Sequence, residues 1–519
     1  MLTLGSFLWA DKYDDLLNDW FNRYGDDDIH TYGPAYDNMD LAWKWAPMIK
    51  ARCYAYELLQ QKILMDKAYQ SINIIMNNAI KKNPMGQDAF LCNESRWKNP
   101  DATWWNDGVE CTGESMLTLG AILRWIYVVK KYPALHNDYL AIANQWLEKI
   151  ENDFFINKWI PWIVDDDRQE PCDYRYPGAM VLPQLACTTC TVDPYAEDYR
   201  LASSPHNKNS DFGLTMLTLY DITGKQEYFD IIRGVALNFK SKMIWQNGGE
   251  YYSWHYYDPT WVGDFSGGIL GFNAKSGIWI EHRNGYGNIS LKFATECYRR
   301  GIVFCRTDIE RYIKTNRDIM WDGVTTRTSD CGVDPAQKTW KLNDGSGPPT
   351  VTSNCGGLYN ALCPYDSTLE YLGYNSYASS PTSWGAKIDI PRFVYTMKIP
   401  PEKLYPPDTM HWVGPLEVIN LEVIDRGAIR LTFYNEVDSA SASQPSNYYF
   451  SRGIEALYVE IDPQDKRIVT VYTEEQDSQV NMKLRIRDVK DIYGNVTFAY
   501  QETNQPYPVS YTHLTLPTN

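Results

Sequence analysis

The sequence predicts a mainly α-helical protein in which helical hairpins form an (α/α) barrel, or toroid, followed by a small all-β sandwich. Three observations support this fold class. Pairs of amphipathic helices recur through the first 400 residues, and long aromatic loops separate the pairs. After a Pro-rich segment, short stretches alternate between apolar and polar side chains.

The helix pairs are predicted from apolar residues spaced three and four apart, which mark one buried face of an α-helix. In each pair the first helix ends near a Tyr, a short polar turn follows, and the second helix begins with an acidic residue and an aromatic. In the third pair this turn is Thr223-Gly224-Lys225. The pairs cover residues 41–80, 113–150, 212–243 and 289–323, and a weaker fifth candidate covers 358–374.

The loops between the pairs favour a closed ring over an open solenoid. Repeated hairpins bury their apolar faces against neighbouring hairpins, so they form a solenoid or, when closed, a toroid. The loops at 83–107, 157–209 and 245–288 are long and rich in aromatic residues. Because long loops without secondary structure are usually functional, we expect a toroid with a cleft at one end.

Several motifs in these helices and loops resemble a known group of enzymes. The phrase LYDITGKQEYFD and the loop sequences WHYYD and IEHRNGYGN resemble the (α/α)-toroid carbohydrate-active enzymes, over about residues 37–323. That group includes six-hairpin glycosidases and alginate- or uronan-cleaving polysaccharide lyases. The resemblance implies a glycan substrate, but it leaves hydrolase and lyase open because one fold hosts both activities.

The last part of the chain has a sequence pattern typical of a β-sandwich. The segments LEVINLEVI, AIRLTFY, ALYVEI, RIVTVY and MKLRIRDV alternate and are separated by turn residues. AIRLTFYNEVDSASASQPSNYYF and RDVKDIYGN resemble bacterial Ig-like modules, which implies a spacer or accessory role. We expect the toroid at 1–400, a Pro-rich linker at 401–415, the Ig-like sandwich at 416–503, and a non-native or disordered tail at 504–519.

Composition limits the possible partners. The net charge of −16 argues against nucleic acid and anionic membranes, and no apolar run approaches the length of a membrane-spanning helix. The 39 Tyr and 19 Trp residues favour surfaces lined by aromatic rings with polar edges. We expect a polysaccharide or oligosaccharide partner and no membrane insertion. The expected location is secreted, periplasmic or at the cell surface, although the N-terminus lacks a complete signal peptide.

Cysteine and acidic residues give no strong metal signal. The pair Cys187 and Cys190 has no second CxxC at zinc-ribbon spacing. Cys331 and Cys355 could form a disulfide, and free buried thiols are the alternative. We expect no cofactor and no metal, while a calcium ion at the Asp-rich turns 26–28 and 165–167 is left open.

A lyase reaction is the first hypothesis for the chemistry. In toroid uronan lyases, as the resemblance implies, an Asn or His neutralises the substrate carboxylate and a Tyr or His takes the α-proton. His206 and Asn207 precede a helix expected to begin near Ser210, where Pro-His-Asn could equally be a helix cap. The catalytic candidates are His206, Asn207, Tyr256, Glu281, His282 and Tyr286.

The substrate-binding candidates come mainly from the stretch 247–288. Its rings suit the apolar face of a pyranose, although a buried aromatic cluster is the alternative reading. The candidates are Trp104, Trp105, Trp162, Arg175, Trp254, His255, Tyr257, Trp261, Arg283 and Asn288.

Two other functions stay open. An inverting-type glycoside hydrolase needs a protonated and an ionised carboxyl group on opposite sides of the scissile bond. The acidic candidates are Asp107, Glu110, Glu114, Asp165, Asp166, Asp167, Asp258 and Glu281. A non-catalytic glycan-binding surface protein would also use aromatic loops and an Ig-like module.

Overall fold

The fold was analysed in a computed structural model. It describes residues 11–28, 38–83, 86–91, 112–160, 206–241, 243–246, 251–254, 286–320, 332–334, 339–341, 359–399, 416, 418–433, 435–450, 454–474, 484–486, 489–492 and 500–501. Two separate hydrophobic cores divide these residues into a helical part and a β part.

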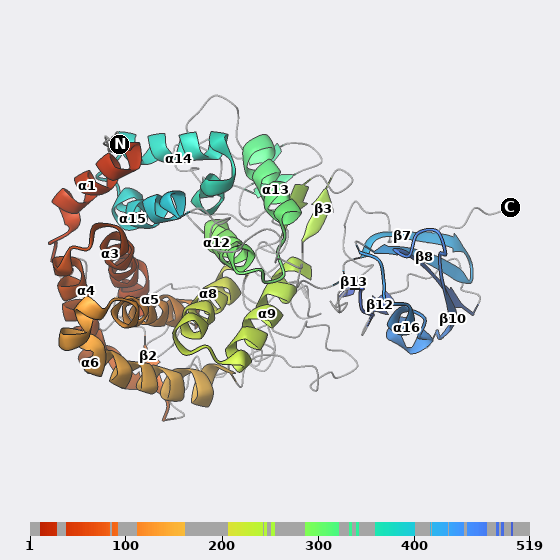
Figure 1. Ribbon diagram of the computed structural model, residues 1–519, viewed down its shortest axis with the longest axis horizontal. Helices are drawn as coiled ribbons and strands as arrows, with labels where there is room; N and C mark the ends of the chain where they lie inside the picture. Colours follow the sequence, from red (N-terminus) through yellow and green to blue (C-terminus); the bar gives the residue numbers. More distant parts are fainter. Residues whose placement is uncertain are drawn as a thin grey trace, which may run out of the picture.

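The long helices form two concentric layers (Figure 1). The inner layer contains α3 (Ala46–Leu59), α5 (Thr112–Lys131), α8 (His206–Thr223), α12 (Tyr286–Arg299) and α15 (Trp384–Lys398). The outer layer contains α1 (Lys12–Tyr24), α4 (Lys62–Ile74), α6 (His136–Lys149), α9 (Gln226–Ser241), α13 (Arg306–Lys314) and α14 (Ser367–Ser379).

The inner layer closes on itself. Contacts run from α3 to α5, α5 to α8 and α8 to α12, and α15 packs back onto α3. Between α12 and α15, Lys292 Nζ lies 3.2 Å from Asp389 Oδ1, and Arg392 Nη2 lies 3.4 Å from Glu296 Oε1. Glu296 follows Lys292 by about one turn in α12, and Arg392 follows Asp389 by about one turn in α15, so the two helices run parallel. The predicted closed ring is therefore observed among the described helices.

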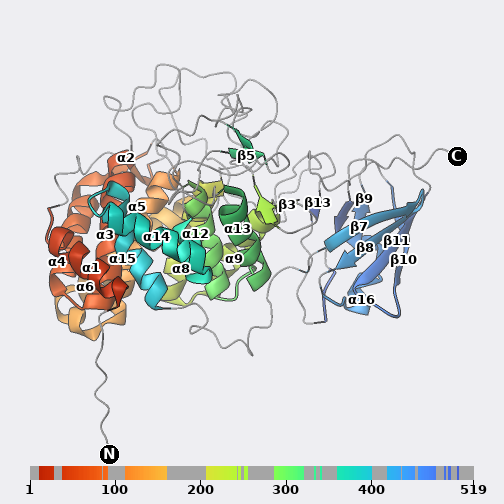
Figure 2. The ribbon, with the colours of Figure 1, turned by 90° about the horizontal axis from the view of Figure 1, so that it is seen from above.

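Shorter elements connect or flank these helices. They are α2 (Asn38–Asp40), the π-helical turns η2 (Leu41–Trp45), η3 (Ile75–Ala79), η5 (Ile150–Trp159) and η9 (Thr315–Met320), and the 3-10 turns η4 (Pro133–Leu135) and η10 (Asn360–Tyr365). Antiparallel hairpins join β1 (Ile80–Lys82) to β2 (Asp88–Phe90), β3 (Ile244–Gln246) to β4 (Tyr251–Ser253), and β5 (Gly332–Asp334) to β6 (Thr339–Lys341). Seen from above, α2 and β5 lie at the same end of the ring (Figure 2).

The predicted helix pairs are observed with shifted boundaries. Gly224 separates α8 from α9 with a φ of 67°, a left-handed conformation that glycine adopts without strain. The helix expected to begin near Ser210 begins at His206 instead, and the loop expected to extend to residue 288 ends before Tyr286. The fifth candidate pair becomes η10 and α14, followed by α15.

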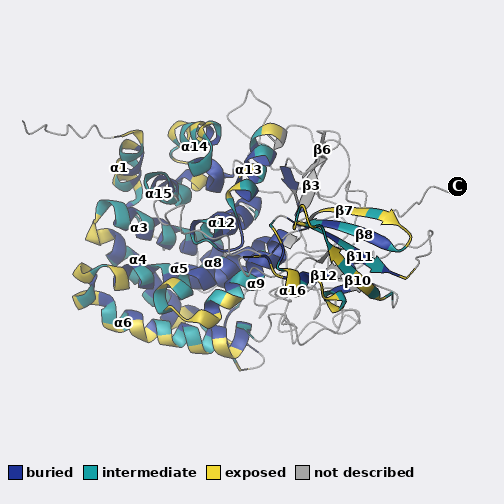
Figure 3. Ribbon diagram, turned by 45° about the vertical axis from the view of Figure 1, so that its right-hand side comes forward, coloured by how far each residue is buried: buried dark blue, intermediate teal, exposed yellow. Residues whose placement is uncertain are grey.

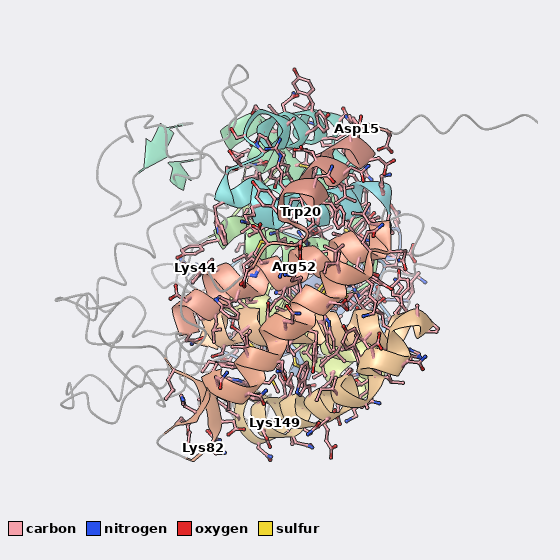
Figure 4. The ribbon with its side chains drawn as sticks, turned by 90° about the vertical axis from the view of Figure 1, so that its left-hand side faces the viewer. Asp15, Trp20, Lys44, Arg52, Lys82 and Lys149 are labelled. Atoms are coloured by element: carbon pink, nitrogen blue, oxygen red, sulfur yellow. The ribbon has the colours of Figure 1, made fainter. Side chains whose placement is uncertain are left out.

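Two helices that the sequence analysis does not predict complete the ring. Helix α1 begins at a cap in which the Asp11 side chain accepts hydrogen bonds from the amides of Tyr13 and Asp14. It packs on α15, where Trp20 Nε1 donates to the carbonyl of Lys387 at 2.7 Å. Figure 4 views this wall of the ring, with Trp20 on α1, Lys44 on η2 and Lys149 at the end of α6.

Burial follows the two layers. Most residues of α8 and α12 are buried, whereas exposed residues gather on outer helices such as α4 and α6 (Figure 3). Among the described residues, no helix combines the length and apolarity needed to cross a membrane.

The β part contains two antiparallel sheets that share one core. One sheet has the order β10 (Ala456–Ile461), β11 (Ile468–Thr473), β8 (Ala428–Phe433) and β7 (Val418–Asp425), and the other has β13 (Tyr500–Gln501), β12 (Leu484–Ile486) and β9 (Tyr448–Phe450). Two short turns, α16 (Ser439–Ala442) and η13 (Pro445–Asn447), precede β9. Leu431 of the first sheet and Phe450 of the second belong to the same buried cluster. A small antiparallel β part after the helices is therefore observed, and its Ig-like character stays a prediction.

Candidate functional site

Polar side chains of the inner helices meet inside the ring. Trp43 on η2 and Lys50 and Tyr54 on the following helix α3 stay partly exposed, at the spacing of one helix face. The matching residues on the other inner helices include Arg124, Lys208, Lys292, Glu296, Asp389, Arg392 and Tyr395. They meet across the ring, because the Arg124 guanidinium lies 4.3 Å from the Tyr54 ring centre and 5.4 Å from that of Tyr395. The centre of the ring is thus polar and charged.

At one end of the ring, the first turns of neighbouring inner helices form a compact group of charged and aromatic side chains. Lys208 on α8 forms an ion pair with Glu114 on α5. The Lys208 ammonium also lies 5.5 Å from the ring centre of Trp43, and the rings of Trp43 and Tyr286 are 6.0 Å apart. We call this group, Trp43, Glu114, Lys208, Asp211 and Tyr286, the mouth cluster.

Local structure explains how these residues meet. Trp43 lies in a π-helical turn, a geometry that recurs at functional sites. A Cβ on Gly113 would lie 1.9 Å from Cδ of Lys208, so a larger residue at this position would displace the Lys208 side chain. Inner helices that begin at one end also direct their positive dipole ends toward the cluster.

The carboxyl group of Asp211 is the most perturbed acid of the cluster. Asp211 is 2% exposed, and burial raises its pKa to about 7, while the positive charges of Lys208 and Lys50 oppose this rise. Burial alone would lower the pKa of Lys208, but the Glu114 carboxylate outweighs it and raises that pKa. Below a pH of about 7 the cluster therefore combines a protonated Asp211 carboxyl group with the Glu114 carboxylate that pairs with Lys208.

A hydrogen-bonded chain fixes α12 beside the cluster. The side chain of Asn288 donates to Asn360 at 2.8 Å, and Asn360 donates to the Tyr377 hydroxyl at 2.6 Å. The side-chain oxygen Oδ1 of Asn288 also accepts a hydrogen bond from the backbone amide of Ala361 at 3.2 Å. Asn288, predicted to bind substrate, is only 6% exposed and positions α12 instead.

Two further predicted site residues belong to helix α8, whereas the sequence analysis placed them before this helix. His206 and Asn207 are the first residues of α8, and both are buried. The His206 ring packs against Phe239, with 5.2 Å between the ring centres. They are as deeply buried as Glu114 and Asp211 of the mouth cluster, so burial does not distinguish them from that cluster.

Trp254 is also a core residue. It is fully buried, and its ring centre lies 5.5 Å from that of Tyr312 and 6.2 Å from that of Tyr359. The predicted stacking on sugar does not fit this position, because the ring has no exposed face. For Trp254, the buried aromatic cluster is the reading that the structure supports.

The first part of the aromatic stretch 247–288, at strand β4, is held in place by buried polar contacts. The Tyr252 hydroxyl donates to Asp308 at 2.8 Å, and Lys240 forms a 3.0 Å ion pair with the same carboxylate. Arg311 donates to the Tyr252 hydroxyl at 2.8 Å. These buried contacts tie the β3–β4 hairpin to α9 and α13.

Of the predicted residues, Tyr286 lies in the mouth cluster. The other candidates lie outside the described residues: Trp104, Trp105, Trp162, Arg175, His255, Tyr256, Tyr257, Trp261, Glu281, His282 and Arg283. Their roles stay predictions. Glu114, one of the carboxylates considered for hydrolysis, is in the cluster.

The sequence analysis missed Trp43, Lys208 and Asp211. Lys208 and Asp211 lie three apart, which places them on one helix face once α8 is known to begin at His206. Charged residues on an otherwise buried helix face were therefore the available signal.

The acidic turn at 26–28 does not resemble a calcium site. Asp27 pairs with Lys387 at 2.6 Å and Asp26 pairs with Lys67 at 2.9 Å. Within the described part of the chain, no group of three or more His, Cys, Asp or Glu side chains could hold a metal ion. The second acidic turn, 165–167, and the Cys331–Cys355 pair lie outside it, and among the described cysteines Cys53, Cys297 and Cys363 are free thiols.

Comparisons with known proteins give only distant likenesses. No protein-family model and no curated protein matches the sequence. Among solved structures, the chain is similar to a D-mannose isomerase, with 10% identity and a TM-score of 0.37 over 77% of this chain and 88% of that chain. It is also similar to a beta-arabinofuranosidase, with 12% identity and a TM-score of 0.30 over 92% of this chain and 76% of that chain. At such low TM-scores the likenesses establish neither a shared fold nor a shared activity.

Proposed function

We propose that the protein is a glycan-processing enzyme whose reaction takes place at the mouth cluster, and that the reaction is hydrolysis of a glycosidic bond. The observation that carries this proposal is the pair of unlike carboxyl groups, Asp211 and Glu114, on neighbouring inner helices. Asp211 holds its proton up to a pH of about 7, whereas Glu114 forms an ion pair with Lys208. Two acids held in different protonation states are what glycoside hydrolysis requires.

Each member of the cluster has a role in this mechanism. Asp211 gives its proton to the glycosidic oxygen as the bond to the anomeric carbon breaks, and the Glu114 carboxylate takes a proton from the attacking water. Trp43 and Tyr286 offer ring faces to the apolar side of a sugar. The positive charges of Lys208 and Lys50, which are partly exposed residues, oppose the rise in the pKa of Asp211.

Elimination from a uronic-acid-containing polysaccharide is the second candidate. The observation that favours it is the position of Tyr286, which lies beside Trp43 and acts electrostatically on Lys208. In a lyase, Lys208 would neutralise the substrate carboxylate and Tyr286 would take the α-proton. His206, the residue first assigned to this chemistry, is buried against Phe239.

A panel of neutral and uronic-acid-containing glycans separates these functions. Products are followed by reducing ends and by the ultraviolet absorbance of unsaturated uronate. Hydrolysis releases reducing ends alone, whereas elimination raises both signals. Binding without either signal would identify a non-catalytic glycan-binding protein and overturn the proposal. Glu114→Gln should remove hydrolysis, and Glu310→Gln, on the outer helix α13, serves as the control.

The proposal also includes a role for the β part of the protein. We assign it an Ig-like accessory or spacer role and a secreted or cell-surface location for the whole protein. Its support is the separate core and the motif RDVKDIYGN, in which Asp491 forms an isolated bridge with Val437 and accepts a 2.8 Å hydrogen bond from Asn435. These are packing contacts, so we assign the catalytic role to the helical ring.

A further inference from the structure

The sheet of β10, β11, β8 and β7 has one face that points away from the core of the β part. In β8, Ile429 and Leu431 belong to this core, so their neighbour Ala428 lies on the opposite face. The register places Tyr472 of β11 opposite Ala428, and Tyr458 of β10 opposite Tyr472. Since residues directly opposite each other share a face, these three side chains form one row on the outer face.

The two tyrosine rings of this row are stacked and remain accessible. Their centres lie 4.2 Å apart, with an angle of 11° between the ring planes. Ala428 is only 2% exposed although it faces away from the core, so its neighbours in the row cover it. Tyr458 is 49% exposed and lies on β10, the last strand of the described sheet. The face of its ring that Tyr472 does not cover is therefore open to a ligand.

A β-bulge lies at each end of the row. In β10 the extra residue Leu457 precedes Tyr458 and is 54% exposed. In β7 the extra residue Ile424 precedes Asp425 and is 41% exposed. Bulges recur at sheet edges and beside functional sites, and they disfavour pairing of an edge strand with another chain. We call these residues the tyrosine row: Tyr458, Tyr472 and Ala428, with Leu457 and Ile424 at its ends.

Polar groups border the tyrosine row on one side. The next row of the same face consists of Glu460, Thr470, Arg430 and Glu422. The Tyr472 hydroxyl donates to Glu460 Oε2 at 3.0 Å, and Arg430 pairs with Glu422 at 3.2 Å. With Asp425 opposite Ala428, carboxylates outnumber the guanidinium group in these two rows. The face thus combines an open aromatic ring with hydrogen-bonding groups and an excess of negative charge.

These features select among the possible partners. A stable protein–protein interface buries about 800 Å² on each partner, far more than a single row of side chains offers, so a second copy of the chain is disfavoured. The excess of carboxylates disfavours an acidic glycan or an anionic membrane. A neutral sugar fits both parts of the face, because its apolar C–H side packs on an aromatic ring and its hydroxyls bond to carboxylates.

We propose that the tyrosine row binds a neutral glycan chain. One sugar packs its C–H side on the open face of the Tyr458 ring, and its hydroxyls donate to the Glu460 carboxylate. The row crosses four strands, a distance of about 14 Å, so it suits a stretch of chain better than a single sugar. This site goes beyond the proposed hydrolysis, because it lies in the β part and is defined by binding and not by turnover.

Native gel electrophoresis of the full-length protein in gels that contain a polysaccharide tests this site. The neutral probes are hydroxyethyl cellulose, mixed-linkage β-glucan and galactomannan, and polygalacturonate is the acidic comparison. We expect at least one neutral polysaccharide to retard the protein, and the dependence of retardation on polysaccharide concentration gives Kd. If no neutral probe retards the wild type, the proposal is overturned.

Matched variants locate the site. Tyr458→Ala should raise Kd for the retarding polysaccharide by about tenfold, whereas Tyr458→Phe should keep wild-type affinity because stacking needs only the ring. Tyr371→Ala, which removes a ring that is 64% exposed on α14, should leave Kd unchanged. Equal Kd values for Tyr458→Ala and the wild type would overturn the proposal, as would a loss of affinity confined to polygalacturonate.

Two measurements keep the test independent of variant folding and of turnover at the mouth cluster. Nitration of Tyr458 by tetranitromethane in the wild type, read by peptide mass spectrometry, should slow when the retarding polysaccharide is present. Nitration at the same rate with and without it would contradict a glycan on this ring. Sedimentation velocity without glycan should give the same species for the wild type and Tyr458→Ala. A dimer that dissociates in Tyr458→Ala would instead identify a second copy as the partner.

Discussion

The raised pKa of Asp211 makes the stability of the folded protein depend on pH. The folded protein holds this carboxyl protonated up to about pH 7, whereas its ordinary pKa is 3.8. Between these values the native state binds more protons than the unfolded state, so the contribution of Asp211 to stability falls as pH rises. Below the lower value and above the higher one, this contribution no longer changes with pH.

Replacing Asp211 by Asn should therefore change the pH dependence of stability. The free energy of unfolding of Asp211→Asn, relative to the wild type, should rise by up to about 1.4 kcal/mol per pH unit between roughly pH 4 and 7. Urea unfolding at several pH values measures this difference. A difference that does not vary with pH would mean that Asp211 titrates normally.

The anchor beneath the aromatic stretch leads to a second prediction. Asp308 is fully buried and holds Lys240 at 3.0 Å and the Tyr252 hydroxyl at 2.8 Å. Asp308→Asn should destabilise the ring by about 3–5 kcal/mol, because Lys240 would remain buried without its anion. On the same helix, Glu310→Gln breaks only the exposed pair with Arg306 and should cost less than about 1 kcal/mol. Similar losses for both variants would refute this distinction.

Single residues also show how far the sequence could predict the site. Glu114 and Tyr286 were named as candidates beforehand, because they lie at or beside the starts of recognisable helices, and their roles stay predictions. Lys208 and Asp211 were missed because their shared face appears only when the helix is extended back to His206. Trp254 was misassigned since composition alone does not separate a buried ring from an exposed one.

At the scale of elements, the closed ring and the inner helices α3, α5, α8 and α12 were predicted, whereas α15 and α1 were not. Apolar residues three and four apart identify α3, α5, α8 and α12. Helix α15 contains Pro391, which disfavours a helix prediction, whereas α1 is amphipathic but short and rich in charged residues, and was overlooked. Both helices depend on tertiary contacts that join the two ends of the helical part.

Those contacts predict that α1 is essential for closure. Trp20 is 1% exposed and donates to the Lys387 carbonyl of α15 at 2.7 Å. Trp20→Ala should destabilise the ring by about 3–5 kcal/mol. Tyr371→Ala, which removes a ring that is 64% exposed on α14, should cost less than about 1 kcal/mol. Urea unfolding followed by helical circular dichroism compares them, and equal losses would show that α1 does not close the ring.

At the scale of the whole molecule, the two hydrophobic cores are built from separate parts of the chain. The ring core ends at Val394 and the sandwich core begins at Leu416. The change from helical periodicity to alternation, with a Pro-rich segment between, was the reason to expect two domains. The detailed pairing of β9, β12 and β13 was not predictable, because these strands are only two or three residues long.

Separate cores should unfold as separate units. Leu431→Ala, in the sandwich core, should lower one calorimetric transition of the full-length protein by an amount that corresponds to about 2–5 kcal/mol. Leu119→Ala, in the ring core, should lower the other transition and leave the first unchanged. A single transition that responds to both variants would contradict this independence.

The pH dependence of glycan hydrolysis tests the proposed chemistry most directly. Turnover by the wild type should fall on the alkaline side with an apparent pKa of about 7, as Asp211 loses its proton. In Asp211→Asn, turnover should drop by about 10²–10⁴-fold and this alkaline limb should disappear. If Asp211→Asn keeps both its turnover and the alkaline limb, Asp211 is not the acid of this reaction.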